Sequence, residues 1–393
     1  MGLKRRTGTK NPPIFSSEFL IQNHADIVSC FAMFFVLGLL FQTSAPIASI
    51  FVVMHHNVTE ALEPSDVVHY TYGRLDTCVV TFYFLIAIVM HAILQEYALD
   101  GFLKKLNRKL HLSKVKHSKF NESGQLFVFY LISLIWGGDI IIREGYLTNI
   151  SKLWQDYPEA HSQMTFMFKF YFIIQLSYWL HCYPELYFQK IKKDEMKPRI
   201  IYTTLYLVFL TAAYCLNFTR IAICLSVLHY LVECVFHIAR LLYFAEKAKA
   251  ASYGFTIWNA LFVLVRLGSI TLSVLTFWYG LAQQGSTSII DPASGNFNTQ
   301  VIRINCLFAI CLLQAWMMWN FINFHLKRMR ERAAQIASSK KKALAKKEKK
   351  LKKDELKKAS EDDVNELPEV DQNAKKDLRQ RATVAASPKS KRH

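Results

Sequence analysis

The sequence predicts an all-α, polytopic membrane protein with about eight transmembrane helices and both termini in the cytosol. Hydrophobic residues make up 52% of its 393 residues and gather in long apolar runs, which is typical of membrane proteins and excludes a soluble enzyme. Short basic stretches separate the runs and recur in alternate loops, as cytosolic loops do. Two Asn-X-Ser/Thr sequons fall in the loops between them, where an oligosaccharide can be attached.

The predicted spans follow from the length of each apolar run, since a helix needs about 20 residues to cross the bilayer core. The runs lie at residues 26–41, 75–94, 125–142, 164–183, 200–216, 221–244, 257–279 and 302–324. We expect the first run to act as an uncleaved signal-anchor, because no apolar segment with a small-residue cleavage site precedes it. A second apolar patch at residues 47–54 either lengthens the first span or lies at the membrane surface.

The orientation follows from the positive charges. The loops after the second and fourth spans and the C-terminal tail are basic, whereas the loops after the first, third and seventh spans hold one, two and no Lys or Arg. Basic loops stay cytosolic, and an even number of spans then puts both termini in the cytosol. The sequons at Asn57 and Asn149 fall on the luminal side, so we predict N-glycosylation there. The sequon at Asn121 is predicted to be cytosolic. The sequon at Asn217 lies too close to the membrane for easy modification.

Composition divides the chain into four segments. Residues 1–25 form a cytosolic N-terminal segment, and residues 26–116 hold the first two spans and a basic cytosolic loop. Residues 117–326 form a six-helix domain, and residues 327–393 form a basic, largely disordered cytosolic tail. The tail has almost no aromatic residues, so it cannot bury a core of its own.

The tail holds 22 Lys and Arg against 11 Asp and Glu, which supplies +11 of the formal net charge of +18. Its first half has a helix-forming composition with Glu and Lys at helical spacing. Such a helix could bind anionic lipid head groups or the phosphates of ribosomal RNA, or it could be a solvated charged segment that only fixes topology. Near the end, Lys389 and Lys391 resemble a dilysine signal for return to the endoplasmic reticulum.

The span at residues 221–244 carries an unusual polar face. His229, Glu233, His237 and Arg240 follow one another at intervals of four, four and three, so the period of a helix aligns them. Ionisable groups in a bilayer are costly unless they face a bundle interior or a water-filled cavity. The face is therefore either a satisfied polar seam between helices or a polar chamber for a head group or substrate.

Other chemical motifs are missing from the sequence. The eight cysteines lie in apolar runs without a CxxC pair, so we predict neither a disulfide framework nor a metal site. We found no phosphate-binding Gly-rich loop, no GxSxG and no HExxH, and we expect no cofactor. His91 and His181 stand alone in the sequence, which favours a packing role for both.

Four longer motifs resemble the translocating chain-associating membrane protein (TRAM) family. They are KNPPIFSSEFLIQNHADIVSC (10–30), HSKFNESGQL (117–126), YWLHCYPELYFQKIKK (178–193) and SGNFN (294–298). The resemblance covers about residues 9–330 and leaves out the tail. It implies a multi-pass protein of the endoplasmic-reticulum membrane beside the Sec61 translocon, where it assists some nascent signal sequences and the exit of transmembrane segments into lipid. Sec61 and these nascent segments are the partners it implies, together with membrane lipids.

The TRAM family is similar to the TRAM/Lag1/CLN8 (TLC) group, which includes ceramide synthases and implies a TLC-type bundle. In the register of the synthase pattern, His229 matches a histidine, Glu233 replaces an aspartate and Arg240 replaces a lysine. The two catalytic histidines fall at Tyr202 and Thr203. Because acyl transfer needs a base near neutral pKa, which histidine supplies, we predict a chamber without enzyme activity.

Two hypotheses remain at this point. The first is a non-enzymatic accessory of translocation, in which a polar interior weakens the apolar barrier of the membrane. The second is a lipid-binding protein or divergent synthase, in which Glu233 with His237 or Arg240 holds a head group. The side chains expected to complete this chamber or lipid site are Gln175, Tyr178, Tyr214 and Arg220.

Overall fold

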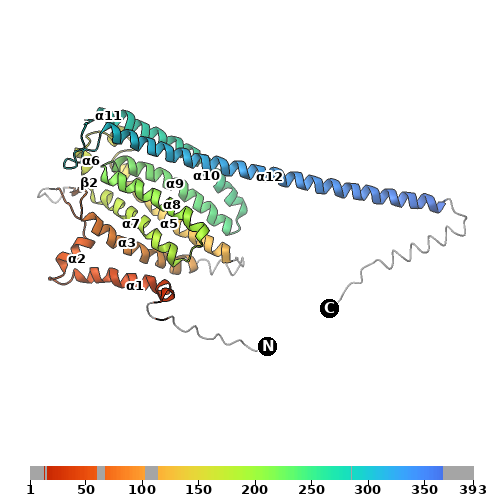
Figure 1. The fold of residues 1–393 in the computed structure, drawn as a ribbon, viewed down its shortest axis with the longest axis horizontal. Coiled ribbons are helices and arrows are strands. Elements are labelled where there is room, and N and C mark those ends of the chain that lie inside the picture. The colour runs from red at the N-terminus through yellow and green to blue at the C-terminus, as the bar shows by residue number, and fades with distance from the viewer. Residues whose placement is uncertain (1–12, 14–15, 60–66, 102–113, 285, 366–393) are drawn as a thin grey trace. The chain divides into compact units, whose positions relative to one another are not determined.

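The apolar runs all form helices in the computed structural model, which describes residues 13, 16–59, 67–101, 114–284 and 286–365 (Figure 1). The longer helices are α1 (Ser17–Gly38), α2 (Ala45–Val52), α3 (Asp76–Ile93), α5 (Lys114–Arg143), α7 (Phe166–Phe188), α8 (Lys193–Cys215), α9 (Thr219–Phe244), α10 (Ala248–Ser273) and α12 (Gln300–Asn365). The all-α prediction is confirmed. The chain divides into two units, Met1–Trp316 and Met317–His393.

Short elements connect the helices. The helical ones are η1 (Leu94–Leu99), η2 (Ile150–Leu153), α6 (Glu159–Ser162), η3 (Val274–Gly280) and α11 (Leu281–Gln283). Two-residue strands β1 (His69–Tyr70) and β2 (Met164–Thr165) pair antiparallel, with His69 opposite Thr165. This pair ties the loop before α3 to the loop before α7.

Six helical segments of the described residues are long and apolar enough to cross a membrane. They are Ser17–Gly38, Asp76–Leu99, Val115–Arg143, Thr219–Phe244, Ala248–Gln283 and Gln300–Lys353. Helices α7 and α8 are each 23 residues long, but α7 buries polar side chains along its length and α8 begins with a charged turn. The protein is thus polytopic, and the count of eight spans with two cytosolic termini stays a prediction that includes α7 and α8.

The patch at residues 47–54 does not lengthen the first span. It forms the separate helix α2, which packs against α1 and α3. The turn before it is fixed by Ser44, whose hydroxyl donates to the carbonyl of Gly38 over 2.8 Å. Helix α1 begins earlier than predicted, because Ser16 caps it by accepting from the backbone N–H of Phe19 over 3.1 Å.

Helices α7 and α9 form the centre of the bundle. Helix α9 packs against α5, α8 and α10, while α7 packs against α3, α5 and α8. Large aromatic side chains fill the space between them, and Trp179, Tyr130, Tyr171 and Tyr230 are all at most 1% exposed. Large apolar side chains such as Phe34, Leu264 and Trp278 are more than half exposed. An exterior of this kind suits lipid, where backbone groups are satisfied within helices.

One end of the bundle is closed by a loop cap, which we define as residues 144–163 with residues 286–299. Tyr157 donates its hydroxyl to the carbonyl of Leu216 over 3.2 Å and accepts from the N–H of Phe297 over 3.0 Å. Asn217 donates to the carbonyls of Pro158 and Gly295, each over 3.2 Å. Figure 1 shows α6, β2 and α11 together at this end. Side chains that reach backbone carbonyls thus join three loops.

The second half of α12 covers the first half of the predicted tail. The helix continues without interruption through Asn365, and the Lys, Ala and Glu content of this segment is typical of strong helix formers. That residues 327–393 are largely disordered stays a prediction. Residues 366–393 lie outside the described part of the chain, and so does the proposed retrieval signal at Lys389 and Lys391.

Candidate functional site

The polar face of α9 forms as the sequence spacing predicts. Glu233 lies between two histidines, with Oε1 3.8 Å from His229 Nε2 and Oε2 3.9 Å from His237 Nε2. The three side chains are 16%, 12% and 4% exposed, in the order Glu233, His229, His237. Arg240 extends the face by one turn, with its guanidinium over the ring of Phe236 at 5.6 Å. The face is therefore nearly closed to solvent.

Helix α10 provides a cation that the spacing on α9 did not reveal. Arg266, 1% exposed, donates from Nη2 to His229 Nδ1 over 2.8 Å and from Nη1 to Gln314 Oε1 over 2.9 Å. Because a guanidinium can only donate, Nδ1 of His229 must be the unprotonated nitrogen. The ring proton of a neutral His229 then sits on Nε2, which faces the hydroxyl of Tyr202 at 3.5 Å. Arg266 joins α9, α10 and α12 in one polar contact.

Tyrosines extend this network toward α5 and α8. The hydroxyl of Tyr202 lies 3.1 Å from that of Tyr130 and 3.1 Å from that of Tyr206. Tyr202 occupies one of the two positions aligned with the catalytic histidines of the synthase pattern, and its neighbour Thr203 is buried. The phenol of Tyr202 joins α8 to α5 through its hydrogen bond with Tyr130.

Gln175 belongs to a second buried network beside the first. It donates to the hydroxyl of Ser133 over 2.8 Å and accepts from the hydroxyl of Tyr230 over 2.8 Å. The oxygen of Tyr230 in turn accepts from the indole N–H of Trp179 over 3.4 Å. The amide of Gln175 is thus satisfied at both of its atoms, as a buried polar group requires. This arrangement corresponds to a polar seam.

The structure does not bring Tyr214 and Arg220 to the face on α9. Tyr214 donates to Asp76 Oδ2 over 2.9 Å, and Asp76 Oδ1 pairs with the buried ammonium of Lys169 at 2.7 Å. Lys169 also donates to the carbonyls of His55 and Thr71, each over 2.8 Å. This cluster, the Asp76 cluster, joins α3, α7 and α8 near the loop cap.

Arg220 enters the loop cap, where its guanidinium donates to the carbonyls of Lys152 and Ala160. The cap also encloses His161, which is 2% exposed. Burial lowers the pKa of His161 to about 3, and the positive charge of Arg220 acts in the same direction. Arg220 is thus a residue that positions loops.

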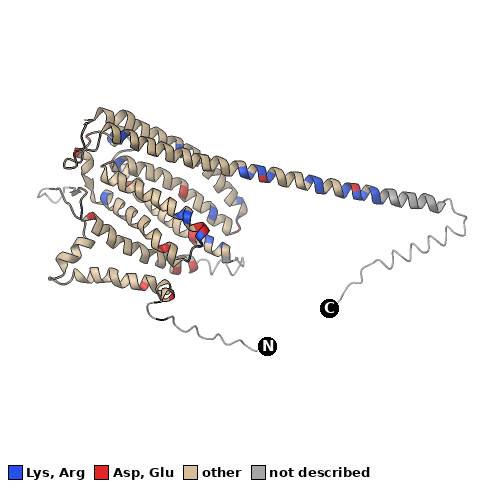
Figure 2. Cartoon of the chain, in the orientation of Figure 1, with Lys and Arg blue, Asp and Glu red and all other residues tan. Residues whose placement is uncertain are grey.

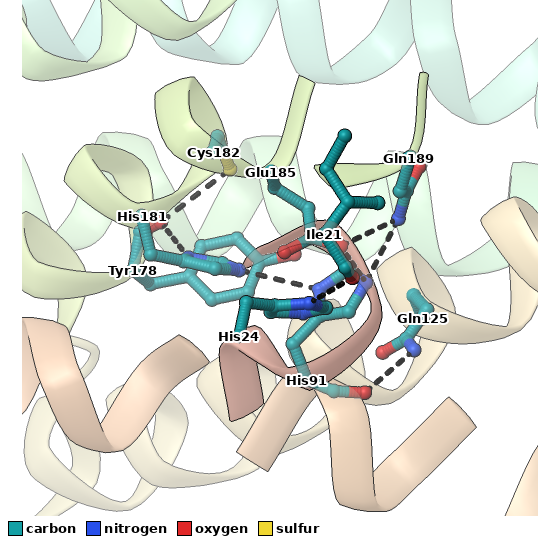
Figure 3. Close-up of polar contacts among 9 residues, drawn as sticks. All are labelled: Ile21, His24, His91, Gln125, Tyr178, His181, Cys182, Glu185 and Gln189. Carbon is teal, nitrogen blue, oxygen red and sulfur yellow. Dashed lines mark hydrogen bonds and ion pairs between the residues drawn. The ribbon is translucent and has the colours of Figure 1, made fainter. Parts of the chain in front are cut away.

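His91 and His181, isolated in the sequence, meet in the fold. His91 Nδ1 lies 3.3 Å from His181 Nε2, and His91 Nε2 lies 3.2 Å from Glu185 Oε1 (Figure 3). Gln189 donates to the same carboxylate oxygen over 3.0 Å. The sequence did not predict this contact, because contacts between α3 and α7 depend on how the helices pack; the packing role expected for the two histidines stays a prediction. Tyr178 lies beside them, stacked on Phe129 at 3.4 Å.

These side chains line a cavity of about 370 Å³ between α3, α5, α7 and α8. At its mouth, Arg199 Nη2 lies 3.0 Å from Glu122 Oε1, and Lys119 lies 3.1 Å from Glu195 Oε2. The hydrogen bond from Lys119 lowers the pKa of Glu195 below its usual range. In Figure 2, positions of charged residues gather at this end of α5 and α8, which is opposite the loop cap. We call these four residues the charged rim.

The sequons lie on exposed loops. Asn57 and Asn149 are exposed, and each accepts from the backbone N–H two residues on, Thr59 and Ser151 respectively. Asn57 bridges to Tyr70 of β1, which pairs with β2. The two sequon loops therefore approach the same end of the bundle. Asn121 and Asn217 are buried, which agrees with the expectation that they stay unmodified.

Among the described residues, no group of three or more His, Cys, Asp or Glu side chains has a geometry that could hold a metal ion.

Comparison with known proteins places the chain in a family. Residues 119–323 match the TLC domain. Translocating chain-associated membrane protein 2 of Mus musculus and that of Homo sapiens are each 45% identical to the chain over 331 residues, which is 84% of this chain and 86% of each relative. Sphingosine N-acyltransferase of Schizosaccharomyces pombe is 26% identical over 202 residues, or 50% of this chain and 49% of that enzyme. The chain is thus a multi-pass membrane protein with a TLC domain, and it belongs to the translocating chain-associating membrane protein family.

Proposed function

We propose that the protein is a non-enzymatic accessory of the Sec61 translocon in the endoplasmic-reticulum membrane. It assists the co-translational translocation of secretory proteins and the insertion of membrane-protein segments. The names of the two 45% identical relatives support the association with a translocating chain. The observation that carries the mechanism is a cavity of about 760 Å³ between α3, α7 and α8, whose mainly apolar lining contains the polar side chains of Asp76, Thr77, Thr81 and Tyr214.

This cavity places a few polar side chains among helices that are otherwise apolar on their outer surface. Asp76 and Tyr214 line its inner side, and the exposed Thr77 and Thr81 of α3 line its outer side. Polar groups and water within a bilayer thin or hydrate it locally, which lowers the cost of moving a polar nascent segment into it. A weakly hydrophobic signal sequence gains most from this effect, because it has the least apolar surface to drive its own insertion.

Chemical turnover is not part of the proposal. Tyr202 and Thr203 stand at the positions of the synthase histidines, and a phenol with a reference pKa of about 10 is a weak base at neutral pH. His229 matches a histidine of the synthase pattern, but its Nδ1 already accepts from Arg266. A base whose free nitrogen is occupied by a guanidinium cannot take a proton from a substrate.

The test is translocation into proteoliposomes that contain Sec61 with and without this protein. A weakly and a strongly hydrophobic signal sequence serve as substrates, and we expect only the weak one to depend on the protein. Replacing Thr77 and Thr81 with Leu removes two hydroxyls from the cavity wall and should reduce that dependence by at least half. The matched control is Thr256→Leu with Thr271→Leu on α10, where both threonines are also exposed and, like Thr77 and Thr81, donate to a backbone carbonyl three or four residues back.

Equal stimulation of both signals, or equal loss with both double variants, would contradict the mechanism. The same liposomes are extracted and assayed for new ceramide. Newly acylated product that disappears on Tyr202→Phe would overturn the non-enzymatic assignment.

A second candidate function is lipid binding on the α9 face, or a divergent sphingoid base N-acyltransferase activity there. The observation that favours it is Glu233, a carboxylate held between two histidines and still 16% exposed. A head group with an N–H donor could bind this carboxylate. An unchanged profile of co-purifying lipid in Glu233→Ala would remove this candidate.

A further inference from the structure

The cavity beside His91 contains a carboxylate oxygen that nothing in the described residues satisfies. Glu185 is 8% exposed and lines the cavity, and its Oε2 has no hydrogen-bond partner among those residues. A buried acceptor that is left without a donor destabilises the fold, and more so when it is charged. Such an atom is expected to meet a donor from outside the chain.

The hydrogen bonds around Glu185 define what that donor must be. His181 Nδ1 faces the carbonyl of Tyr178 and must carry a proton, because a carbonyl only accepts. With His181 neutral, its Nε2 accepts from Nδ1 of His91. Nε2 of a neutral His91 is then the unprotonated nitrogen, and it accepts from the side-chain amide of Gln189 over 3.0 Å. The same amide donates to Oε1 of Glu185, whereas Oε2 has no hydrogen-bond partner among the described residues and belongs to a side chain that lines the cavity. Figure 3 shows Glu185 among these residues.

The walls of the cavity indicate that the ligand is a lipid. Leu126, Trp179, Leu186 and Pro198 line it together with the stacked ring of Tyr178, and all of them belong to helices of the membrane bundle. Pockets of this size and composition bind apolar ligands with a few oriented polar contacts. The cavity ends at the charged rim, so a head group can remain near water while its chains lie along the helices.

The rim supplies a contact for an anionic group. Arg199 meets Glu122 and Glu195 through Nη2 in both cases. A guanidinium has five N–H donors, so Arg199 can bind a phosphate oxygen without giving up these carboxylates. We propose that the cavity binds the head group of an aminophospholipid, with its primary ammonium donating to Glu185 Oε2 and its phosphate beside Arg199. A quaternary ammonium has no N–H and cannot satisfy Oε2.

The experiment uses the full-length protein in detergent micelles and measures binding of three amphiphiles by native mass spectrometry. They are dioleoyl phosphatidylethanolamine, dioleoyl phosphatidylcholine, and a long-chain alkylamine that has the ammonium but no phosphate. We expect phosphatidylethanolamine to bind about tenfold more tightly than phosphatidylcholine, the effect of one charge-assisted hydrogen bond. The affinity of the alkylamine should lie between those of the two phospholipids, because its ammonium can donate to Glu185 but it has no phosphate to bind Arg199.

The variant is Glu185→Gln, which keeps the shape of the side chain and should abolish the preference for phosphatidylethanolamine. Its matched control is Glu159→Gln, an exposed carboxyl at the opposite end of the bundle, which should keep the preference. Equal binding of the two phospholipids to the wild-type protein would overturn the proposal even if the variant failed to fold. An unchanged preference in Glu185→Gln would also overturn it. The proposal does not depend on translocation activity, so the two can fail separately.

Discussion

Arg266 is the residue on which the interior polar contacts depend most. Its guanidinium is buried, and it satisfies His229 on α9 and Gln314 on α12 at the same time. A buried charge is tolerated when its hydrogen bonds are made, and the removal of one partner leaves the others in an apolar surrounding. Arg266 and its two acceptors, His229 and Gln314, therefore contribute to stability together.

Replacing Arg266 with Leu should lower the free energy of unfolding by about 3–5 kcal/mol, the range for breaking a buried charged network. Thermal unfolding of the purified protein in detergent measures the change. Arg143→Gln is the matched control, because Arg143 is an exposed arginine paired with Asp139 and such pairs contribute about 1 kcal/mol at most. Similar melting temperatures for the Leu variant and the wild type would contradict the assigned role.

His161 makes the loop cap sensitive to acid. Its pKa is lowered to about 3 by burial, whereas the unfolded chain binds a proton near pH 6.5. Between these values only the unfolded state is protonated, so stability is fully present above pH 6.5 and decreases as the pH falls toward 3. We expect the melting temperature of the wild type to fall between pH 7 and pH 5 more than that of His161→Gln. Parallel curves for the two proteins would show that His161 does not contribute.

At the scale of helices, sequence patterns predicted the features that depend only on the geometry of one helix. The face of His229, Glu233 and His237 follows from spacing along one helix, and the apolar runs predicted where helices form. The contact between Tyr214 and Asp76 joins residues 138 positions apart, and no periodicity reports how two helices pack. For the same reason the pair of His91 and His181 and the contact of Arg266 with His229 were missed. Composition indicated a helix in the first half of the tail, and α12 extends through that segment.

The tail half of α12 carries a testable charge effect. Lys340, Lys341 and Lys342 are exposed on one turn of the helix, and each basic residue near an anionic membrane contributes about 1 kcal/mol. Changing all three to Gln should weaken salt-sensitive binding to phosphatidylserine vesicles by roughly a hundredfold. Flotation of the full-length protein in nanodiscs with such vesicles measures it. No change would favour the solvated tail that only fixes topology, and ribosome sedimentation with the same variant tests the alternative partner.

At the scale of the whole molecule, the two sequons test the predicted topology. Asn57 and Asn149 are exposed and their loops are tied by β1 and β2, so both should lie in the lumen. In microsomes, Asn57→Gln and Asn149→Gln should each remove one glycan from the protein, seen as a mobility shift that endoglycosidase H abolishes. Asn121→Gln is the control and should change nothing, because Asn121 is buried. Loss of a glycan in the control, or modification of only one of the two loops, would contradict the predicted orientation.

The two ends of the bundle respond differently to ionic strength. The loop cap is held by side chains that donate to backbone carbonyls, whereas the charged rim is held by partly exposed ion pairs such as Arg199 with Glu122. Salt screens exposed ion pairs over about 10 Å at 0.1 M and leaves hydrogen bonds to carbonyls almost unchanged. Amide hydrogen exchange in rising salt should therefore accelerate first at the beginnings of α5 and α8. We then expect the mouth of the cavity to loosen while the far end of the same helices stays closed. If the rim faces the cytosol as the predicted topology has it, the ionic composition there would set how readily the cavity exchanges its contents.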